Sequence, residues 1–365
     1  MKIKLRQAFD LQMGKTPARN RPDYWNGDHK WISIADIGNA EKFLTKTKES
    51  ITEAGIDGSG IKVVPKGTVI MSFKLSIGKT AITSEDMYTN EAIMAFIDNG
   101  KFAVDTDYLY HLCCGTNWTA GTNKAVMGLT LNKATLLEKE IPLPDINEQH
   151  EIATKLDKID AIIAERQQQL ELIDQAVKSR FIELFGDPQR NPHGYKHTKL
   201  SDIATYYNGL TYKPENVAAE GTIVLRSSNI QNSQLDFADT IRVDCAIKER
   251  LMVQKNDILM CSRNGSAKLV GKVALIKDIQ EPMSFGAFMM IIRSHYFGYL
   301  MTYFQMDAFR QQIKTGATTT INQITGRMLD DVTIPLPPMA LVDQFAAFVE
   351  QTDKSKLCGK MEVAA

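Results

Sequence analysis

The run Ile-Pro-Leu-Pro occurs twice in this chain of 365 residues, starting at Ile141 and again at Ile334, which is 193 positions later. Two further pairs of segments match in the same order and at nearly the same offset: Trp31–Ile37 with Val224–Ile230, and Lys66–Phe73 with Lys255–Ser262. Ordered matches at one offset indicate an internal duplication. The chain is therefore predicted to consist of a domain, a helix, a second domain and a second helix.

The two outer domains have the mixed pattern of an α+β fold. Short runs rich in branched residues predict strands, and the clearest lie at 67–73, 91–97, 257–261 and 272–276. The apolar spacing of His295–Ile313 predicts an amphipathic helix. We expect two tandem α/β domains, separated by long antiparallel coiled-coil helices and related by a pseudo-two-fold internal repeat. The predicted segments are a first domain at 1–144, a central spacer helix at 145–190, a second domain at 191–337 and a short C-terminal spacer helix at 338–365.

The segment after the first Ile-Pro-Leu-Pro run predicts a long helix. Asp145 can cap its start, and Glu148 stands three residues later, where it can return the hydrogen bond. Apolar residues then recur at every seventh position: Leu156, Ile163, Leu170, Val177 and Leu184. This spacing favours a coiled-coil helix of about 40 residues and about 60 Å over an ordinary surface helix, which is the alternative. Gly186 and the prolines after it are expected to end the helix.

The second helix is the predicted antiparallel partner of the first. Leu341, Phe345 and Phe348 continue an apolar seam, whereas Thr352, Ser355 and Gly359 lose it. We therefore expect a helix of about half the length of the first, or one that frays beyond Val349.

Composition restricts the class of protein. No apolar run approaches the roughly 20 residues that cross a bilayer, and the N-terminal segment lacks the apolar core of a signal peptide. The five cysteines form no Cys-x-x-Cys pair, which argues against a zinc site or disulfide scaffold and favours the reducing cytoplasm. The net charge is zero, but residues 1–145 carry +1, residues 146–195 carry −3 and residues 196–333 carry +3. Any polyanion would therefore bind through local basic patches.

The sequence motifs of several enzyme classes are incomplete or absent in this chain. Gly-Lys-Thr occurs at 14–16 and 78–80, but a phosphate-binding loop needs a glycine where Phe9 and Phe73 stand. An adenine methyltransferase motif is absent, since Asn191–Tyr195 lacks the second proline, and no glycine-rich cofactor loop is found. No pattern of carboxylates and lysine suits a nuclease metal site, and the six histidines are scattered. The sequence predicts no active site and no metal site.

The order of these features resembles the DNA-specificity subunit of Type I restriction–modification systems. The resemblance covers nearly the whole chain. It rests on "GKTP", "YW" and "WISIADI" near the start, on "IPLPDINEQHEIATKLDKIDAII" between the halves, and on the second "IPLPP" with "GTVIMSF" and "NDILMCS".

The resemblance implies a non-catalytic subunit of a larger complex. Each of two target-recognition domains would bind one half of a split site in double-stranded DNA, and two helices would hold the domains apart. Methyltransferase (modification) subunits and a restriction subunit would supply the chemistry, with S-adenosylmethionine, Mg²⁺ and ATP bound to those partners. The heptad residues Leu156, Ile163, Leu170, Val177 and Leu184 would then belong to the partner-binding helix.

Candidate DNA contacts are basic and amide side chains on polar loops, because these groups bond phosphates and base edges. The N-terminal loop offers Lys15, Arg19 and Arg21, with Tyr24, Trp25 and Trp31 as its anchors. Equivalent loops after the shared strand offer Lys74, Ser76 and Lys79 in one half and Arg263, Asn264, Ser266 and Lys268 in the other. The loops before the Ile-Pro-Leu-Pro runs offer Asn117, Asn123, Lys124, Thr319 and Asn322. Trp118 is expected either to contact DNA or to pack in the core.

Three other interpretations stay open at the level of sequence. The chain could be the specificity subunit of a related split restriction enzyme, a coiled-coil protein-interaction scaffold, or an unrecognised enzyme. Salt dependence separates the first from the second, since affinity for DNA falls steeply with salt and an apolar protein interface responds little. Binding of S-adenosylmethionine by the isolated chain would indicate the third.

Overall fold

The computed structural model describes residues 1–74, 76–118, 131–314 and 322–364. Within them the chain divides into two units, Met1–Ala164 and Glu165–Ala365. The finer division into four segments stays a prediction. Among the helices in these ranges, none combines the length and the apolarity that a membrane crossing requires.

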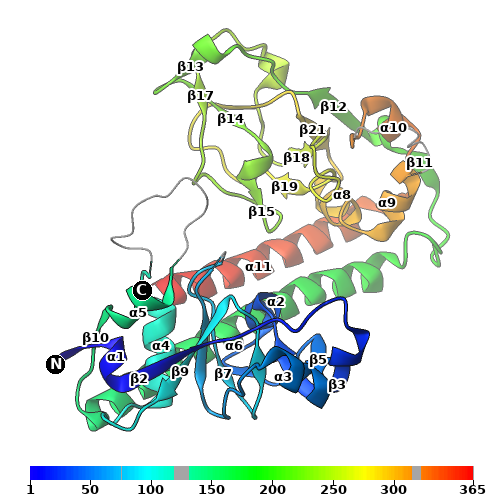
Figure 1. Ribbon diagram of the computed structural model, residues 1–365. Helices are drawn as coiled ribbons and strands as arrows, with labels where there is room; N and C mark the ends of the chain where they lie inside the picture. Colours follow the sequence, from blue (N-terminus) through cyan, green and yellow to red (C-terminus); the bar gives the residue numbers. More distant parts are fainter. Residues whose placement is uncertain (75, 119–130, 315–321, 365) are drawn as a thin grey trace. The chain divides into compact units, whose positions relative to one another are not determined.

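Unit 1 is built on a five-stranded sheet (Figure 1). Its strand order is β2 (Phe9–Met13), β9 (Ile93–Asp98), β6 (Val69–Ser72), β7 (Thr80–Thr83) and β4 (Phe43–Leu44). A second sheet joins β5 (Glu49–Ile51), β3 (Trp25–Ile32) and β8 (Tyr88–Thr89), and β1 (Lys2–Lys4) pairs with β10 (Glu140–Pro142). The helices are α1 (Leu5–Ala8), α2 (Ile34–Asn39), α3 (Glu53–Ser59), α4 (Thr106–Gly115) and α5 (Lys133–Leu137), with the 3₁₀ turn η1 (Pro22–Tyr24). Every residue of β6 and β7 is buried, and burial on both faces explains the apolar run Val69–Met71 of β6.

Unit 2 repeats this plan with one strand fewer in the main sheet. The order is β12 (Ala204–Asn208), β21 (Met289–Ser294), β18 (Ile258–Cys261) and β19 (Val273–Leu275). A second sheet joins β13 (Val217–Ala218), β17 (Arg242–Val243), β14 (Thr222–Leu225) and β20 (Met283–Phe285). The pairs are β11 (His197–Lys199) with β22 (Thr333–Pro335) and β15 (Ile230–Gln231) with β16 (Gln234–Leu235). The short helices are α7 (Leu200–Ile203), α8 (Phe297–Tyr303), α9 (Asp307–Lys314) and α10 (Gly326–Asp330), with 3₁₀ turns η2 (Pro214–Asn216), η3 (Ser227–Asn229) and η4 (Glu249–Leu251).

Matching hydrogen bonds recur in the two units at the spacing that the duplication predicts. Tyr108 Oη donates to the carbonyl of Pro142 at 3.0 Å, and Tyr299 Oη donates to that of Pro335 at 3.1 Å. The amide of Leu131 donates to Phe73 in unit 1, as that of Ile324 donates to Ser262 in unit 2. The four predicted strands coincide with β6, β9, β18 and β19.

The predicted helix over His295–Ile313 is wrong in one respect, because the structure breaks it into α8 and α9. Phe304 and Phe309 lie on either side of the break, with ring centroids 4.8 Å apart in the unit 2 core. Both rings are buried where the helix is interrupted, and the apolar spacing of the segment does not reveal this interruption.

The long helix α6 (Ile146–Phe185) begins directly after Asp145 and ends directly before Gly186, as the two local signals predict, although the predicted spacer segment extends to residue 190. Asp145 Oδ1 accepts the amides of Asn147 and Glu148, each at 3.0 Å, which satisfies donors that an uncapped helix leaves unpaired. Gly186 ends the helix with φ of 74°, a conformation that glycine adopts without steric cost. At 40 residues α6 is about 60 Å long.

The second long helix, α11 (Met339–Ala364), packs against the part of α6 that lies in unit 2. The ring of Phe345 lies 5.6 Å from Phe181 and 5.4 Å from Phe185, and Lys356 pairs with Asp174. Residues further along α11 contact earlier residues of α6, so the two helices run antiparallel over this stretch.

The seam of α11 agrees with the predicted one at Leu341 and Phe345 and differs from it at Phe348, which does not join the core. Val342 and Val349 also pack in the core, and half-buried Thr352 and Lys356 follow them. At 26 residues α11 is also longer than half of α6. The ion pair of Lys356 explains why the seam continues where the apolar pattern stops.

The heptad residues of α6 differ in exposure. Leu156, Leu170, Val177 and Leu184 are half-buried, while Ile163 is 48% exposed. Nearby Ile159, Ile162 and Leu172 are at least as exposed. A role for this helix in binding a partner stays a prediction.

Candidate nucleic-acid interface

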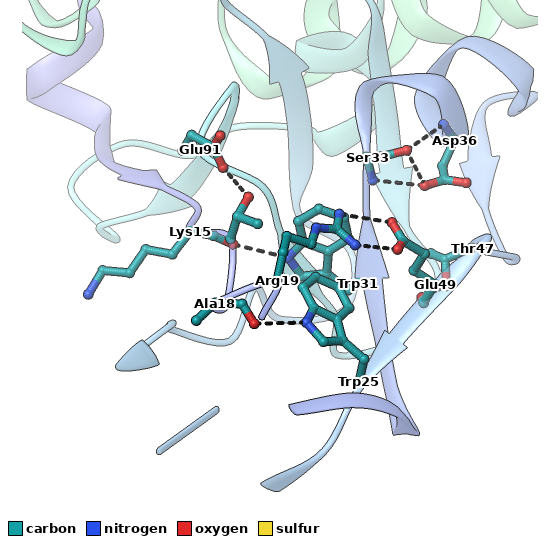
Figure 2. A network of polar contacts seen from close by, with 11 residues as sticks. Lys15, Ala18, Arg19, Trp25, Trp31, Ser33, Asp36, Thr47, Glu49 and Glu91 are labelled. Carbon is teal, nitrogen blue, oxygen red and sulfur yellow. Dashed lines mark hydrogen bonds and ion pairs between the residues drawn. The ribbon is translucent and has the colours of Figure 1, made fainter. Parts of the chain in front are cut away.

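The N-terminal loop of unit 1 is held by stacked aromatic and guanidinium groups (Figure 2). The Arg19 guanidinium lies 3.9 Å from the ring centre of Trp25 and 5.0 Å from that of Trp31, and it forms a two-pronged ion pair with Glu49. The indole N–H of Trp31 donates to the carbonyl of Lys15 at 3.0 Å. The hydrogen bond from Arg19 lowers the pKa of the Glu49 carboxyl. The predicted aromatic anchors are therefore in place, and Arg19 belongs to them.

The other two basic residues of this loop also have partners within unit 1. Arg21 donates to Asp23 at 2.9 and 2.7 Å and lies 4.5 Å from the ring centre of Tyr24. Lys15 Nζ donates to the carbonyl of Ser59 at 3.1 Å. All three predicted DNA contacts thus stabilise the loop, and a direct contact with DNA stays a prediction for each.

Arg19→Ala is expected to destabilise unit 1 by about 1 kcal/mol, which sums an exposed ion pair and a cation–π contact. The melting temperature should fall by about 2–4 °C in calorimetry of the full chain. Lys101→Ala, at an exposed turn of the same unit, is the matched control and should leave it unchanged. Loss of DNA affinity at an unchanged melting temperature would instead assign Arg19 to the DNA contact.

The loop after β6 presents the basic residues of unit 1 that are best placed to reach a ligand. Lys79 and Ser76 are exposed, and Lys74 is half-buried. Burial opposes ionisation of Glu91, but hydrogen bonds from Thr16 and the backbone, with the charge of Lys74, hold its pKa below the usual value. The hydroxyl of Ser72 accepts the amide of Lys79 at 3.1 Å, which ties Lys79 to the end of β6.

The second loop of unit 1 is only partly described. Asn117 is exposed, whereas Trp118 is 2% exposed and donates its indole N–H to the carbonyl of Cys113 at 2.8 Å. Trp118 is therefore a core residue. Asn123 and Lys124, like Thr319 in unit 2, lie outside the described residues.

In unit 2 the two predicted loops meet. The amide of Asn264 donates to the carbonyl of Asn322 at 3.3 Å, and the Asn322 side chain donates to the carbonyl of Gly265 at 3.4 Å. Asn264 Oδ1 accepts the amide of Ser266 at 3.0 Å, which closes a tight turn. Arg263, Ser266, Lys268 and Asn322 are all exposed on this joint surface. All four residues belong to unit 2, so the fold of this unit alone brings them together.

Three residues of these surfaces were not predicted from the sequence. Glu91 accepts the hydroxyl of Thr16, Ser227 accepts the side-chain amide of Asn264 at 3.3 Å, and the Phe288 ring lies 5.4 Å from the Arg263 guanidinium. A glycine just before an apolar run, as in "SFGAFMMII", could have marked the turn that carries Phe288. Within the described ranges, no group of three or more His, Cys, Asp or Glu side chains is arranged to hold a metal ion.

A family model for the Type I restriction modification DNA specificity domain matches residues 1–173 and 192–357 of the chain. The chain belongs to this family. Each matched interval contains one copy of the repeated strands, and the specificity domain's function is recognition of DNA sequence.

Among curated relatives, this specificity protein is similar to the Type I restriction enzyme MjaIX specificity subunit of Methanocaldococcus jannaschii. The two are 24% identical over 95% of this chain and 85% of that protein. It is also 28% identical to the EcoKI specificity subunit of Escherichia coli, over 45% of this chain and 38% of that protein.

Two solved structures share the fold of this specificity protein. The S subunit of the Type I restriction–modification system from M. genitalium aligns over all of this chain and 92% of its own, with a TM-score of 0.53 and 15% identity. A chain from a structure on complex assembly and conformational transition of the type I R-M system aligns over the same shares, with a TM-score of 0.55 and 16% identity.

Proposed function

We propose that each unit of this specificity protein reads one half of a bipartite DNA target. The joined loops of unit 2 carry the proposal. They gather a guanidinium, an ammonium, a hydroxyl and an amide side chain on one exposed surface, and these are groups that bond phosphates and base edges. The equivalent loop of unit 1 supplies Lys74, Ser76 and Lys79.

We further propose that α6 and α11 form the coiled-coil spacer, and that α6 docks methyltransferase subunits. The exposed Ile159, Ile162 and Ile163 support docking, because such a cluster on one helix favours contact with another protein. Catalysis then belongs to the methyltransferase and restriction subunits, with their S-adenosylmethionine, Mg²⁺ and ATP, and the complex works in the cytoplasm.

Mapping methylated sites in a genome with and without this chain tests the proposal. We expect one bipartite motif, with an undefined gap between two defined halves, to disappear when the chain is deleted. An unchanged methylation map, with the partner subunits present, would contradict the proposal. The affinity of the complex for its target should also fall linearly on a log–log plot against salt.

Arg263→Ala is expected to weaken binding to the target by about 1–3 kcal/mol, as for a lost base contact. The sequence preference should relax in one half-site only, which a binding selection on randomised half-sites would measure. Arg250→Ala, an exposed arginine of unit 2 outside these loops, is the control. Equal weakening on all DNA sequences would make Arg263 a phosphate contact.

A further inference from the structure

Backbone hydrogen bonds identify which residue of unit 1 corresponds to Phe288. The carbonyl of Phe288 accepts the amide of Ser262 at 3.0 Å, and the carbonyl of Ala92 accepts that of Phe73, also at 3.0 Å. The residues that follow them, Met289 and Ile93, also have matching contacts. The carbonyl of Met289 accepts the amide of Gly209, and the carbonyl of Ile93 accepts the amide of Gly14. Phe288 and Ala92 therefore occupy the same place in the repeated framework.

The two residues differ in what they present at that place. Ala92 is 8% exposed, whereas Phe288 is 59% exposed. A single exposed phenylalanine is common on protein surfaces and by itself indicates nothing. Here, however, the framework accepts a buried alanine, so the packing of the turn does not need an aromatic ring.

The turn that carries Phe288 is rigid. Its carbonyl accepts three donors at 3.0 Å, namely the amides of Ser262 and Arg263 and the hydroxyl of Ser262. Gly286, two residues earlier, donates to the carbonyl of Leu225 at 2.9 Å and accepts the amide of Met289 at 2.8 Å. A side chain on so fixed a backbone can be placed against a ligand with little loss of conformational entropy.

The Phe288 ring lies within the joined loops of unit 2. Its centre is 5.4 Å from the Arg263 guanidinium, close enough for a cation–π contact that orients both groups. Asn264, the next residue after Arg263, contacts Asn322 through the backbone. The surface thus combines one apolar ring with groups suited to hydrogen bonding of base edges.

We propose that Phe288 reads a thymine, packing its ring against the C5-methyl group in the major groove beside the base that Arg263 contacts. This rests on the proposed function of unit 2. The methyl of thymine is the apolar feature among the base edges of the major groove, whereas the other edges offer donors and acceptors that a phenyl ring cannot bond. Arg263 suits a guanine at the neighbouring pair, so the half-site of unit 2 contains a thymine next to a guanine–cytosine pair. Ala92 leaves unit 1 without this readout.

Replacement of thymine by deoxyuridine tests the proposal, because it removes the methyl group and nothing else. The full chain, assembled with its methyltransferase subunits, is titrated against its mapped target duplex, with each thymine replaced singly. We expect one position in the half-site affected by Arg263→Ala to lose about fourfold in affinity, as for burial of one methyl group. Phe288→Ala should lose a similar factor on the thymine duplex and show no further loss on the deoxyuridine duplex.

The variant is expected to fold, since unit 1 carries alanine at the equivalent position. Phe237→Ala, which removes a phenylalanine of unit 2 that is 47% exposed, is the matched control and should keep the thymine preference. The proposal is overturned if Phe288→Ala retains the full preference for thymine. It is overturned equally if the variant weakens thymine and deoxyuridine duplexes by one factor, which would indicate stacking or a wedge between base pairs. A complex with no sequence preference at all would overturn the proposed function itself.

Discussion

Insertion of four residues after Gln168 of α6 is expected to lengthen the preferred gap between the two half-sites by one or two base pairs. Four helical residues add about 6 Å and rotate the remainder of the helix by about 40°. One base pair advances about 3.4 Å along the DNA axis. If α6 sets the distance between the recognition units, the half-site sequences should stay the same while the gap grows. A selection on targets with randomised gap lengths measures this shift.

The insertion point lies between two sets of contacts that α6 makes with other elements, and it interrupts the hydrogen bond from Arg166 to Gln169 within the helix. Asp157 pairs with His111 at 2.8 Å and with Lys42 at 2.5 Å in unit 1, before Gln168. Asp174 and Phe181 contact α11 in unit 2, after Gln168. Both sets of contacts should therefore survive, although the seam between them is locally unwound.

The control is the same insertion after Gly100, in a turn of unit 1 where no atom lies within 4 Å of an added Cβ. It should leave the gap unchanged. A helix-insertion variant that folds and binds DNA, yet keeps the original gap, would show that the partner subunits or α11 position the two units.

The ion pair between Asp257 and Arg293 makes Arg293→Met the most destabilising substitution that we predict. Asp257 is 1% exposed, and Arg293 donates to its two oxygens at 2.7 and 2.8 Å. Without the guanidinium the buried carboxylate keeps only the amide of Gln254 at 2.7 Å. Removing one partner of a buried pair typically costs about 3–5 kcal/mol. Calorimetry of the full chain should show a clearly lower transition for unit 2 and an unchanged one for unit 1.

Removing the charge of both partners provides the matching control. Asp257→Leu combined with Arg293→Met leaves no uncompensated charge, so it should recover much of the lost stability. If the double variant is no more stable than Arg293→Met alone, the loss comes from packing around Arg293, including its contact with Tyr207, and not from the carboxylate.

Features that depend on neighbouring residues were predictable from the sequence. The two Ile-Pro-Leu-Pro runs predict the repeat, and the same hydrogen bonds recur around Pro142 and Pro335. Asp145 and Gly186 mark the ends of α6 because capping and left-handed backbone geometry are local effects. The short apolar strands were predictable for the same reason, since alternation and burial act over a few residues.

Which polar side chains are available to a ligand depends on long-range packing, and the sequence does not reveal it. Arg19 meets Glu49 across 30 positions of sequence, and an arginine in such a pair looks the same in the sequence as one that faces solvent. Trp118 enters the unit 1 core, where its ring centre lies 6.5 Å from that of Phe96 in β9. Phe288 stands beside Arg263 because β18 and β21 pair side by side. Local sequence patterns predict which helix or strand a residue belongs to. Its exposure and its contacts depend on which distant segments pack against it. At these positions, that packing determines whether a side chain is available to DNA or holds the structure together.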